Sequence, residues 1–211
     1  MKKIMLGLLV LMSVSASAAT LGMVEVKTKN VTLSYPVLSG DSSAALKAVN
    51  NAIKKTVKQW KAGVDSTCTL DVTSTIDAFN QRYLSFHSAV SSYCEGGAHA
   101  DRSFEGHVYD LNTGQEVILE EQFNGIPNFS DYLAEAIPSR LVDECFSGSV
   151  EENIKLIDTF SVILLGVKND ELYLTVEPPY MESACGFMSS IPLKEIGTVL
   201  KTDSILKTWL K

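Results

Sequence analysis

A segment near the middle of the chain combines residue types that can bind a partner. Residues 93 to 99 read Tyr-Cys-Glu-Gly-Gly-Ala-His and close an alternating stretch. Paired glycines permit a bulge or a positive-φ turn, which frees backbone amides and exposes the neighbouring side chains. We expect a binding rim here, joined by a tyrosine from a later proline-rich loop. Its residues are Tyr93, Glu95, Gly96, Gly97, His99, Asp101 and Tyr180.

The same residues also fit a structural interpretation. In that interpretation Gly96-Gly97 supplies only a turn, and His99 satisfies a nearby carbonyl group. Tyr180 follows two prolines, so it can either anchor a partner or pack in the core. In the binding interpretation, the carboxylates of Glu95 and Asp101 favour a cationic ligand.

Catalytic chemistry has weaker support in the sequence. His99, Asp101 and His107 carry side chains that zinc accepts, but their spacing matches no known site and a strand separates the last two. No GxSxG elbow surrounds a serine. The pairs Glu120-Glu121 and Glu151-Glu152 are adjacent, whereas acid-base catalysis needs opposed carboxylates. We therefore predict a non-enzymatic protein without metal or cofactor, with a metal-dependent hydrolase as the lesser alternative.

The first eighteen residues have the layout of a cleavable secretory signal. Two lysines precede the apolar run Ile4–Val14, and an Ala-Ser-Ala motif ends at Ala18. The run is shorter than the roughly 20 residues that a membrane-spanning helix needs. We expect residues 1–18 to be removed, and residues 19–211 to form a single periplasmic or secreted domain without a membrane anchor.

The charge of the chain restricts its partners. The chain has 25 acidic and 18 basic residues, a formal charge of −7. Loss of Lys2 and Lys3 with the signal leaves 16 basic residues against 25 acidic ones, which is −9. An acidic surface attracts cationic partners and repels polyanions, although charge of this size also serves solubility. We therefore predict no binding to nucleic acid.

Four cysteines in an oxidising compartment favour two disulfides. Residues 67–78 and 82–94 both alternate and are joined by a short polar turn, as in a hairpin. Paired residues in an antiparallel hairpin have a constant index sum, and a sum of 162 places the apolar side chains on one face. This register gives the pairs Val72–Val90, Ile76–Phe86, Ala78–Leu84 and Cys68–Cys94. We predict a Cys68–Cys94 bridge and, by elimination, a Cys145–Cys185 bridge.

Further elements follow from periodicity and turn signals. The stretch Val24–Tyr35 alternates loosely and ends at Pro36, which indicates a first strand. A helix follows, with Asp41 or Ser42 as its N-cap and Gly63 at its end, and with lysines on its outer side. That lysine run indicates a solvated face or, less commonly, a recognition patch. Later segments predict two more hairpins (103–110 with 115–119, 159–167 with 171–177), a helix over 129–145 and short helices at the end of the chain.

Hairpins separated by helices indicate an α+β fold. We expect an antiparallel sheet of hairpins, covered by helices on one face and held by two disulfides. The sequence contains no internal repeat and no low-complexity linker.

The order of these elements and several motifs resemble one family. The matching pieces are Tyr35-Pro36, Gly96-Gly97-Ala98-His99, Tyr109 to Glu116, Leu172 to Gly186 and Ile191-Pro192-Leu193. Together they resemble the extracytoplasmic domain of RsiV-type anti-sigma factors, which is also appended to a PdaC-type peptidoglycan deacetylase. The chain shows no transmembrane, sigma-binding or deacetylase segment, so those activities do not carry over.

The resemblance implies an envelope protein that binds a component related to cell-wall chemistry. In the RsiV-type case that ligand is lysozyme. We therefore expect a periplasmic binding protein for a lysozyme-like muramidase or another basic protein. The alternative is a carbohydrate-binding module for peptidoglycan fragments.

Overall fold

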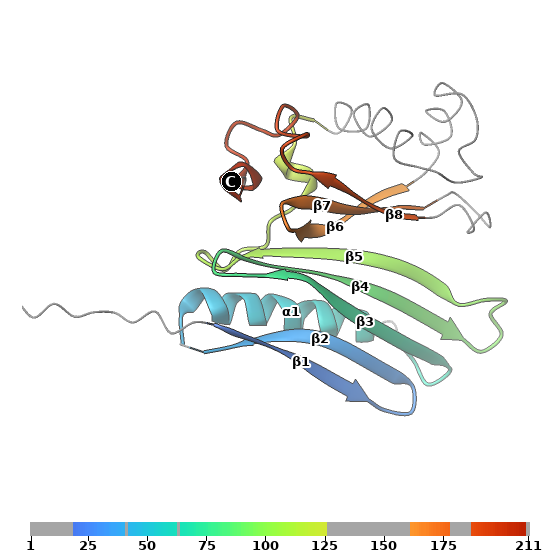
Figure 1. Ribbon diagram of the computed structural model, residues 1–211. Coiled ribbons are helices and arrows are strands. Elements are labelled where there is room, and N and C mark those ends of the chain that lie inside the picture. The colour runs from blue at the N-terminus through green and yellow to red at the C-terminus, as the bar shows by residue number, and fades with distance from the viewer. Residues whose placement is uncertain (1–18, 41, 63, 126–160, 178–186, 210–211) are drawn as a thin grey trace, which may run out of the picture.

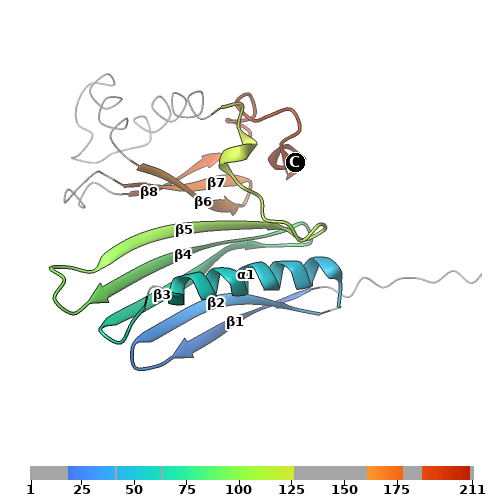
Figure 2. The same cartoon turned by 180° about the vertical axis from the view of Figure 1, so that it is seen from behind.

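The computed structural model describes residues 19–40, 42–62, 64–125, 161–177 and 187–209. These residues form three layers, in which a five-stranded sheet lies between helix α1 and a three-stranded sheet (Figures 1 and 2). Four predictions concern residues outside the described part. They are the signal over 1–18, the helix over 129–145, the Cys145–Cys185 bridge and the position of Tyr180.

The larger sheet contains the first five strands in chain order. Neighbouring strands are antiparallel except β2 and β3, which are parallel and connected through α1. The predicted all-antiparallel sheet is therefore wrong at this one pairing. The elements are β1 (Thr20–Lys27), β2 (Val31–Ser39), α1 (Ala44–Ala62), β3 (Cys68–Phe79), β4 (Tyr83–Cys94) and β5 (Asp101–Asp110).

Helix α1 forms where its periodicity predicted it. Its buried face carries Leu46, Val49, Ile53, Val57 and Trp60, which pack against the larger sheet. The hydroxyl of the residue before the helix, Ser43, accepts a hydrogen bond from the Leu46 amide at 3.2 Å and so caps the first turn. The cap thus lies one residue after Ser42.

The first strand was predicted as one segment, and this is wrong. The chain turns at Thr28–Asn30, so that β1 and β2 form a hairpin. Pro36 lies inside β2, opposite Met23. It is tolerated because β3 pairs with β2 only as far as Ser34, so no neighbouring strand needs the missing amide.

The long hairpin of β3 and β4 has nearly the predicted register. Val72–Val90, Ile76–Phe86 and Cys68–Cys94 are paired, and the two cysteines form a disulfide. The register shifts at Asp77, where a bulge places Ala78 opposite Ser85 and not opposite Leu84. After the bulge the facing of the strand changes, so that Ala78 packs toward the smaller sheet and Phe79 toward α1.

The smaller sheet has the order β6-β7-β8. Strands β6 (Ser161–Lys168) and β7 (Glu171–Glu177) form the predicted hairpin, with positive φ at Asn169 and Asp170 as a two-residue turn requires. Strand β8 (Phe187–Pro192) was not predicted as a strand. The last described element is helix α4 (Ile205–Trp209). The predicted hairpin partner of β5 is reduced to a bridge between Tyr109 and Glu116, followed by the 3₁₀ helix η1 (Glu120–Gln122).

Two glycines let the layers approach closely. A Cβ atom at Gly106 on β5 would collide with the carbonyl oxygens of Leu164 and Leu165, and one at Gly166 on β6 would collide with the Ser85 hydroxyl. Contact of this kind places β6 directly on β4 and β5, on the face opposite α1. Among the described residues, α1 is the helix that covers one face of the larger sheet, and a second sheet covers part of the other face.

Candidate functional site

The predicted rim lies at the exposed tip of the β4–β5 hairpin, which projects from one end of the larger sheet (Figure 1). Tyr93 is 42% exposed although it is a large aromatic residue. Every other described residue of the prediction is also exposed: Glu95, Gly96, Gly97, His99 and Asp101. The structure therefore brings six of the seven predicted residues together on one surface.

The loop owes its shape to its glycines and to three anchors. Gly96 has a φ of 90°, a conformation that L side chains rarely adopt. The Gly97 amide donates to the Cys94 carbonyl at 3.0 Å, which closes the turn. At its base, the Cys68–Cys94 disulfide and a hydrogen bond from the Glu95 amide to the Thr67 carbonyl (3.0 Å) tie the loop to the start of β3.

Asp65 is a rim residue that sequence reasoning missed. Its Oδ1 accepts hydrogen bonds of 2.7 Å from both the amide and the hydroxyl of Thr67. These bonds lower the pKa of the Asp65 carboxyl, so the group keeps its charge. The Asp-Ser-Thr sequence is typical of a side-chain-closed turn and was the available signal.

The acidic side chains thus come from two loops that a disulfide joins. Asp65, Glu95 and Asp101 are all exposed, and Arg102 adds one exposed cation next to them. His99 is exposed, and its Nδ1 lies 3.4 Å from the neighbouring Ala100 carbonyl. The arrangement suits recognition of a cationic surface by charge, with Tyr93 as an aromatic contact.

A second polar cluster lies away from the rim, between β5 and the end of α1. Nδ1 of His107 lies 3.0 Å from Glu116 Oε1, and Nε2 lies 3.7 Å from Glu105 Oε2. The Trp60 indole donates to the same Glu105 oxygen at 2.9 Å. Burial alone would lower the pKa of His107, but the two glutamates outweigh it and raise that pKa.

The pKa values of the neighbouring groups follow from the same contacts. The close approach of His107 lowers the pKa of Glu105 in spite of partial burial. Burial raises the pKa of the Tyr109 hydroxyl, and the Glu116 charge adds to this effect. The Tyr109 hydroxyl is fully buried and has no hydrogen bond of good geometry. Sequence alternation gave no sign of this cluster, because its members come from separate segments.

The three side chains considered as metal ligands do not converge. His107 is buried on the α1 side of β5, whereas His99 lies on the exposed loop and Asp101 is exposed at the start of β5. Within the described ranges, no group of three or more His, Cys, Asp or Glu side chains has metal-binding geometry.

A largely buried, hydrogen-bonded pair of side chains lies on the opposite face of the larger sheet. Nδ1 of His87 is 3.0 Å from Oδ1 of Asp77, at the bulge beneath β6. The Ser85 hydroxyl nearby accepts a hydrogen bond from the Val167 amide at 2.9 Å. These groups join the two sheets, and we assign them a structural role.

None of the helices in the described part of the chain combines the length and apolarity needed to cross a bilayer.

Comparison with known proteins shows the fold. No family model and no curated protein sequence matches the chain. A crystal structure of a DUF3298 family member from Bacteroides fragilis matches with a TM-score of 0.61 and 13% identity, over 90% of this chain and 97% of that one. A DUF3298 family protein from Pseudomonas aeruginosa matches with a TM-score of 0.51 and 10% identity, over 88% and 93% respectively. DUF3298 is the family of RsiV-like domains, so the predicted resemblance is confirmed at the level of the fold. The chain has the fold of DUF3298 family proteins.

Proposed function

We propose that this chain is a non-enzymatic binding protein of the cell envelope that recognises a basic, lysozyme-like muramidase through the β4–β5 tip. The observation that carries the proposal is the exposed rim itself. Tyr93 and the three carboxylates of Asp65, Glu95 and Asp101 lie on one disulfide-anchored surface.

Charge supports a cationic protein as the partner. The whole chain has a formal charge of −7, so its net charge and the charge of the rim are both negative. Both therefore attract a cationic partner. Glu95 and Asp101 reach solvent without a carboxylate-binding partner among the described ion pairs. Their charges are therefore available to lysine or arginine side chains of a partner.

Rigidity supports binding by a preformed surface. The disulfide and the Glu95–Thr67 hydrogen bond hold the loop before a partner arrives. A preordered loop loses less conformational entropy on association, which favours affinity. The resemblance to RsiV-type domains is the reason for choosing lysozyme among basic proteins.

The test is binding of the purified, oxidised protein to a basic c-type lysozyme at low and moderate salt, with muramidase activity read in parallel. We expect saturable binding that weakens with salt. Glu95→Lys combined with Asp101→Lys should weaken binding at least tenfold, since exposed interfacial charge pairs each contribute about 1 kcal/mol. Loss of muramidase activity on binding would make the protein an inhibitor.

A matched control separates the rim from net charge. Glu120→Lys combined with Asp203→Lys changes the total charge equally at two exposed positions outside the rim. We expect this variant to bind almost as the parent does. Equal losses in both variants, or no binding by the parent, would overturn the proposal.

Peptidoglycan fragments are the second candidate ligand, and exposed Tyr93 favours them. Aromatic side chains commonly provide the contact surface for a neutral sugar ring. Binding to a glycan should depend on Tyr93 and only weakly on salt. Two results together would favour this candidate over a protein partner. The parent protein would bind glycan with an affinity that does not change with salt, and the Tyr93→Ala variant would lose that binding.

A further inference from the structure

The outer face of α1 is basic in a chain that is acidic as a whole. The helix contains five lysines and no aspartate or glutamate. All five are exposed: Lys47, Lys54, Lys55, Lys58 and Lys61. In the described part of the chain, none of them forms an ion pair. The function proposed above makes no use of this face.

Helical geometry gathers these charges into a stripe. Lys47, Lys54, Lys58 and Lys61 follow one another at intervals of seven, four and three residues, which recur on one side of a helix. At 1.5 Å per residue the stripe is about 21 Å long. Lys55 widens it on the side toward β5.

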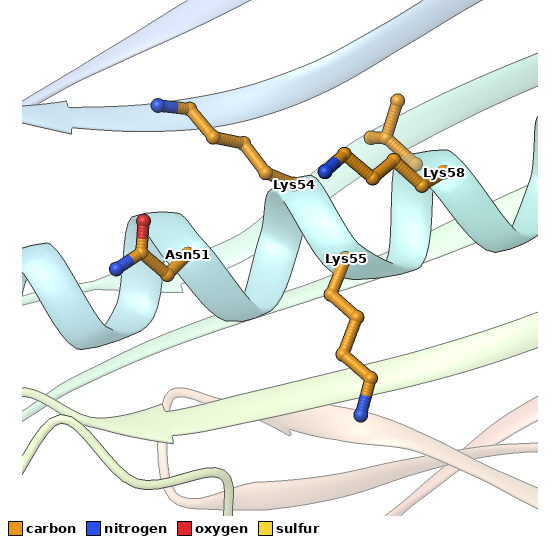
Figure 3. Close-up of a pocket in the computed structure, with 5 residues that line it drawn as sticks. Asn51, Lys54, Lys55 and Lys58 are labelled. Atoms are coloured by element: carbon orange, nitrogen blue, oxygen red, sulfur yellow. The ribbon is translucent and has the colours of Figure 1, made fainter.

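The stripe is an open surface and not an enclosed pocket. Figure 3 shows Lys54 and Lys55 leaving the helix toward opposite sides, with Asn51 one turn earlier. The hollow between them is lined by Asn51, Lys54, Lys55, Val57 and Lys58, which all belong to this one helix. Such a surface fits an extended charged partner better than a small molecule.

The composition of the stripe indicates what that partner is. Specific protein interfaces are depleted in lysine and use aromatic or arginine anchors, and the exposed face of α1 has neither. Lysine is a point charge that binds phosphate without demanding a fixed geometry. A surface of many phosphates satisfies a row of lysines without a shaped interface.

We propose that α1 docks this protein on an anionic phospholipid surface through its lysine stripe. Docking is electrostatic and reversible, because the stripe has no large exposed apolar side chain to insert. The attraction acts within a Debye length, about 8 Å at physiological salt, so the acidic remainder of the molecule weakens it little. This inference is independent of what the β4–β5 tip binds.

The test measures sedimentation of the purified protein with vesicles of phosphatidylcholine, with and without phosphatidylglycerol, at low and physiological salt. We expect binding only to the anionic vesicles, with strong weakening by salt. Each lysine near an anionic surface contributes about fivefold in affinity. The double variant Lys54→Glu with Lys58→Glu should therefore lose at least about 25-fold.

The control is Lys194→Glu with Lys201→Glu, which gives the same net charge at two exposed lysines beyond β8. The segment after β8, to which both lysines belong, lies on the side of the larger sheet opposite α1 (Figure 1). We expect little change, and far-ultraviolet circular dichroism should show that both variants keep their secondary structure.

Three results would overturn the proposal. One is failure of the parent protein to bind the anionic vesicles, and another is an equal loss in both double variants. The third is binding to soluble polyphosphate with no binding to vesicles, which would assign the stripe to a free polyanion.

Discussion

At the scale of single residues, His107 links protonation to stability. It lies between Glu105 and Glu116, and their charges hold its pKa above the ordinary value of 6.5. A raised folded-state pKa means that the charged histidine stabilises the fold fully below pH 6.5. This contribution is lost as the pH rises through the higher folded-state pKa.

We predict that His107→Gln destabilises the protein by about 1–3 kcal/mol at pH 6 and by less at alkaline pH. Urea unfolding of parent and variant across pH 5 to 9 would measure the difference. Measurements spaced by roughly one pH unit are enough to locate the pKa at which the difference changes. His99→Gln is the control, because His99 is exposed. A difference that does not change with pH would contradict the protonation argument.

Glu105 gives the opposite pH dependence. The close approach of His107 lowers the pKa of Glu105 from 4.5, so the contribution of Glu105 is present above that pH and is lost as the pH falls through the lowered value. The His107 and Glu105 contributions therefore overlap between pH 4.5 and 6.5. This pair alone favours a stability maximum in a mildly acidic window.

At the scale of elements, the two sheets are joined by backbone contact. Gly106 on β5 faces the Leu164 and Leu165 carbonyls, and Gly166 on β6 faces the Ser85 hydroxyl and the Asp77 carboxylate. A methyl group at either position has no space unless β6 moves away. The Ser85–Val167 hydrogen bond, which crosses this contact, would lengthen as a result.

We predict that Gly106→Ala and Gly166→Ala each destabilise the protein by about 1–3 kcal/mol or more, as overpacked cores do. Gly22→Ala is the matched control, because its Cβ would meet Val37 at an ordinary 3.6 Å. That control also gains from a less flexible unfolded chain. Thermal unfolding of the three variants measures this, and a neutral Gly106→Ala would contradict the close approach of β5 and β6.

The sequence predicted elements best where the pairing was local. Alternation in residues 67–94 was sufficient for the register and the Cys68–Cys94 bridge, because both arms lie side by side. The bulge at Asp77 was not predicted, since it depends on packing beneath β6. Strand β8 was not predicted for a similar reason, because it forms by pairing with β7 and its own sequence shows no clear strand pattern.

In the candidate site too, residues close together in the sequence were predicted to lie together, whereas residues distant in the sequence were missed. Six rim residues lie within nine positions of the sequence, so a turn signal was enough to group them. Asp65 joins them through Thr67, whose carbonyl accepts a hydrogen bond from the amide of Glu95, 28 residues further along the chain. The cluster of Trp60, Glu105, His107 and Glu116 depends on how α1 crosses β5, which composition and periodicity do not encode.

At the scale of the whole molecule, the central sheet contributes to two cores. One core lies between α1 and the sheet and includes Leu84, Phe86 and Tyr109. The other lies toward β6–β8 and includes Tyr83 and Val108, neighbours of those residues on β4 and β5. Because the same two strands supply both cores, unfolding of one layer exposes the strands that support the other.

We predict that the protein unfolds in a single cooperative transition, as one domain over residues 19–211 requires. The C-terminal segment belongs to the same unit, since Trp209 stacks on Tyr83 with ring centroids 4.4 Å apart and Arg82 donates to the Thr208 carbonyl. Trp209→Ala should therefore lower the single melting temperature, with a loss of about 3–5 kcal/mol, and should not create a second transition. Calorimetry tests this by comparing calorimetric and van't Hoff enthalpies, which agree only for two-state unfolding. Two separate transitions would show that the α1 layer and the β6–β8 layer fold independently, and that the single-domain prediction is wrong.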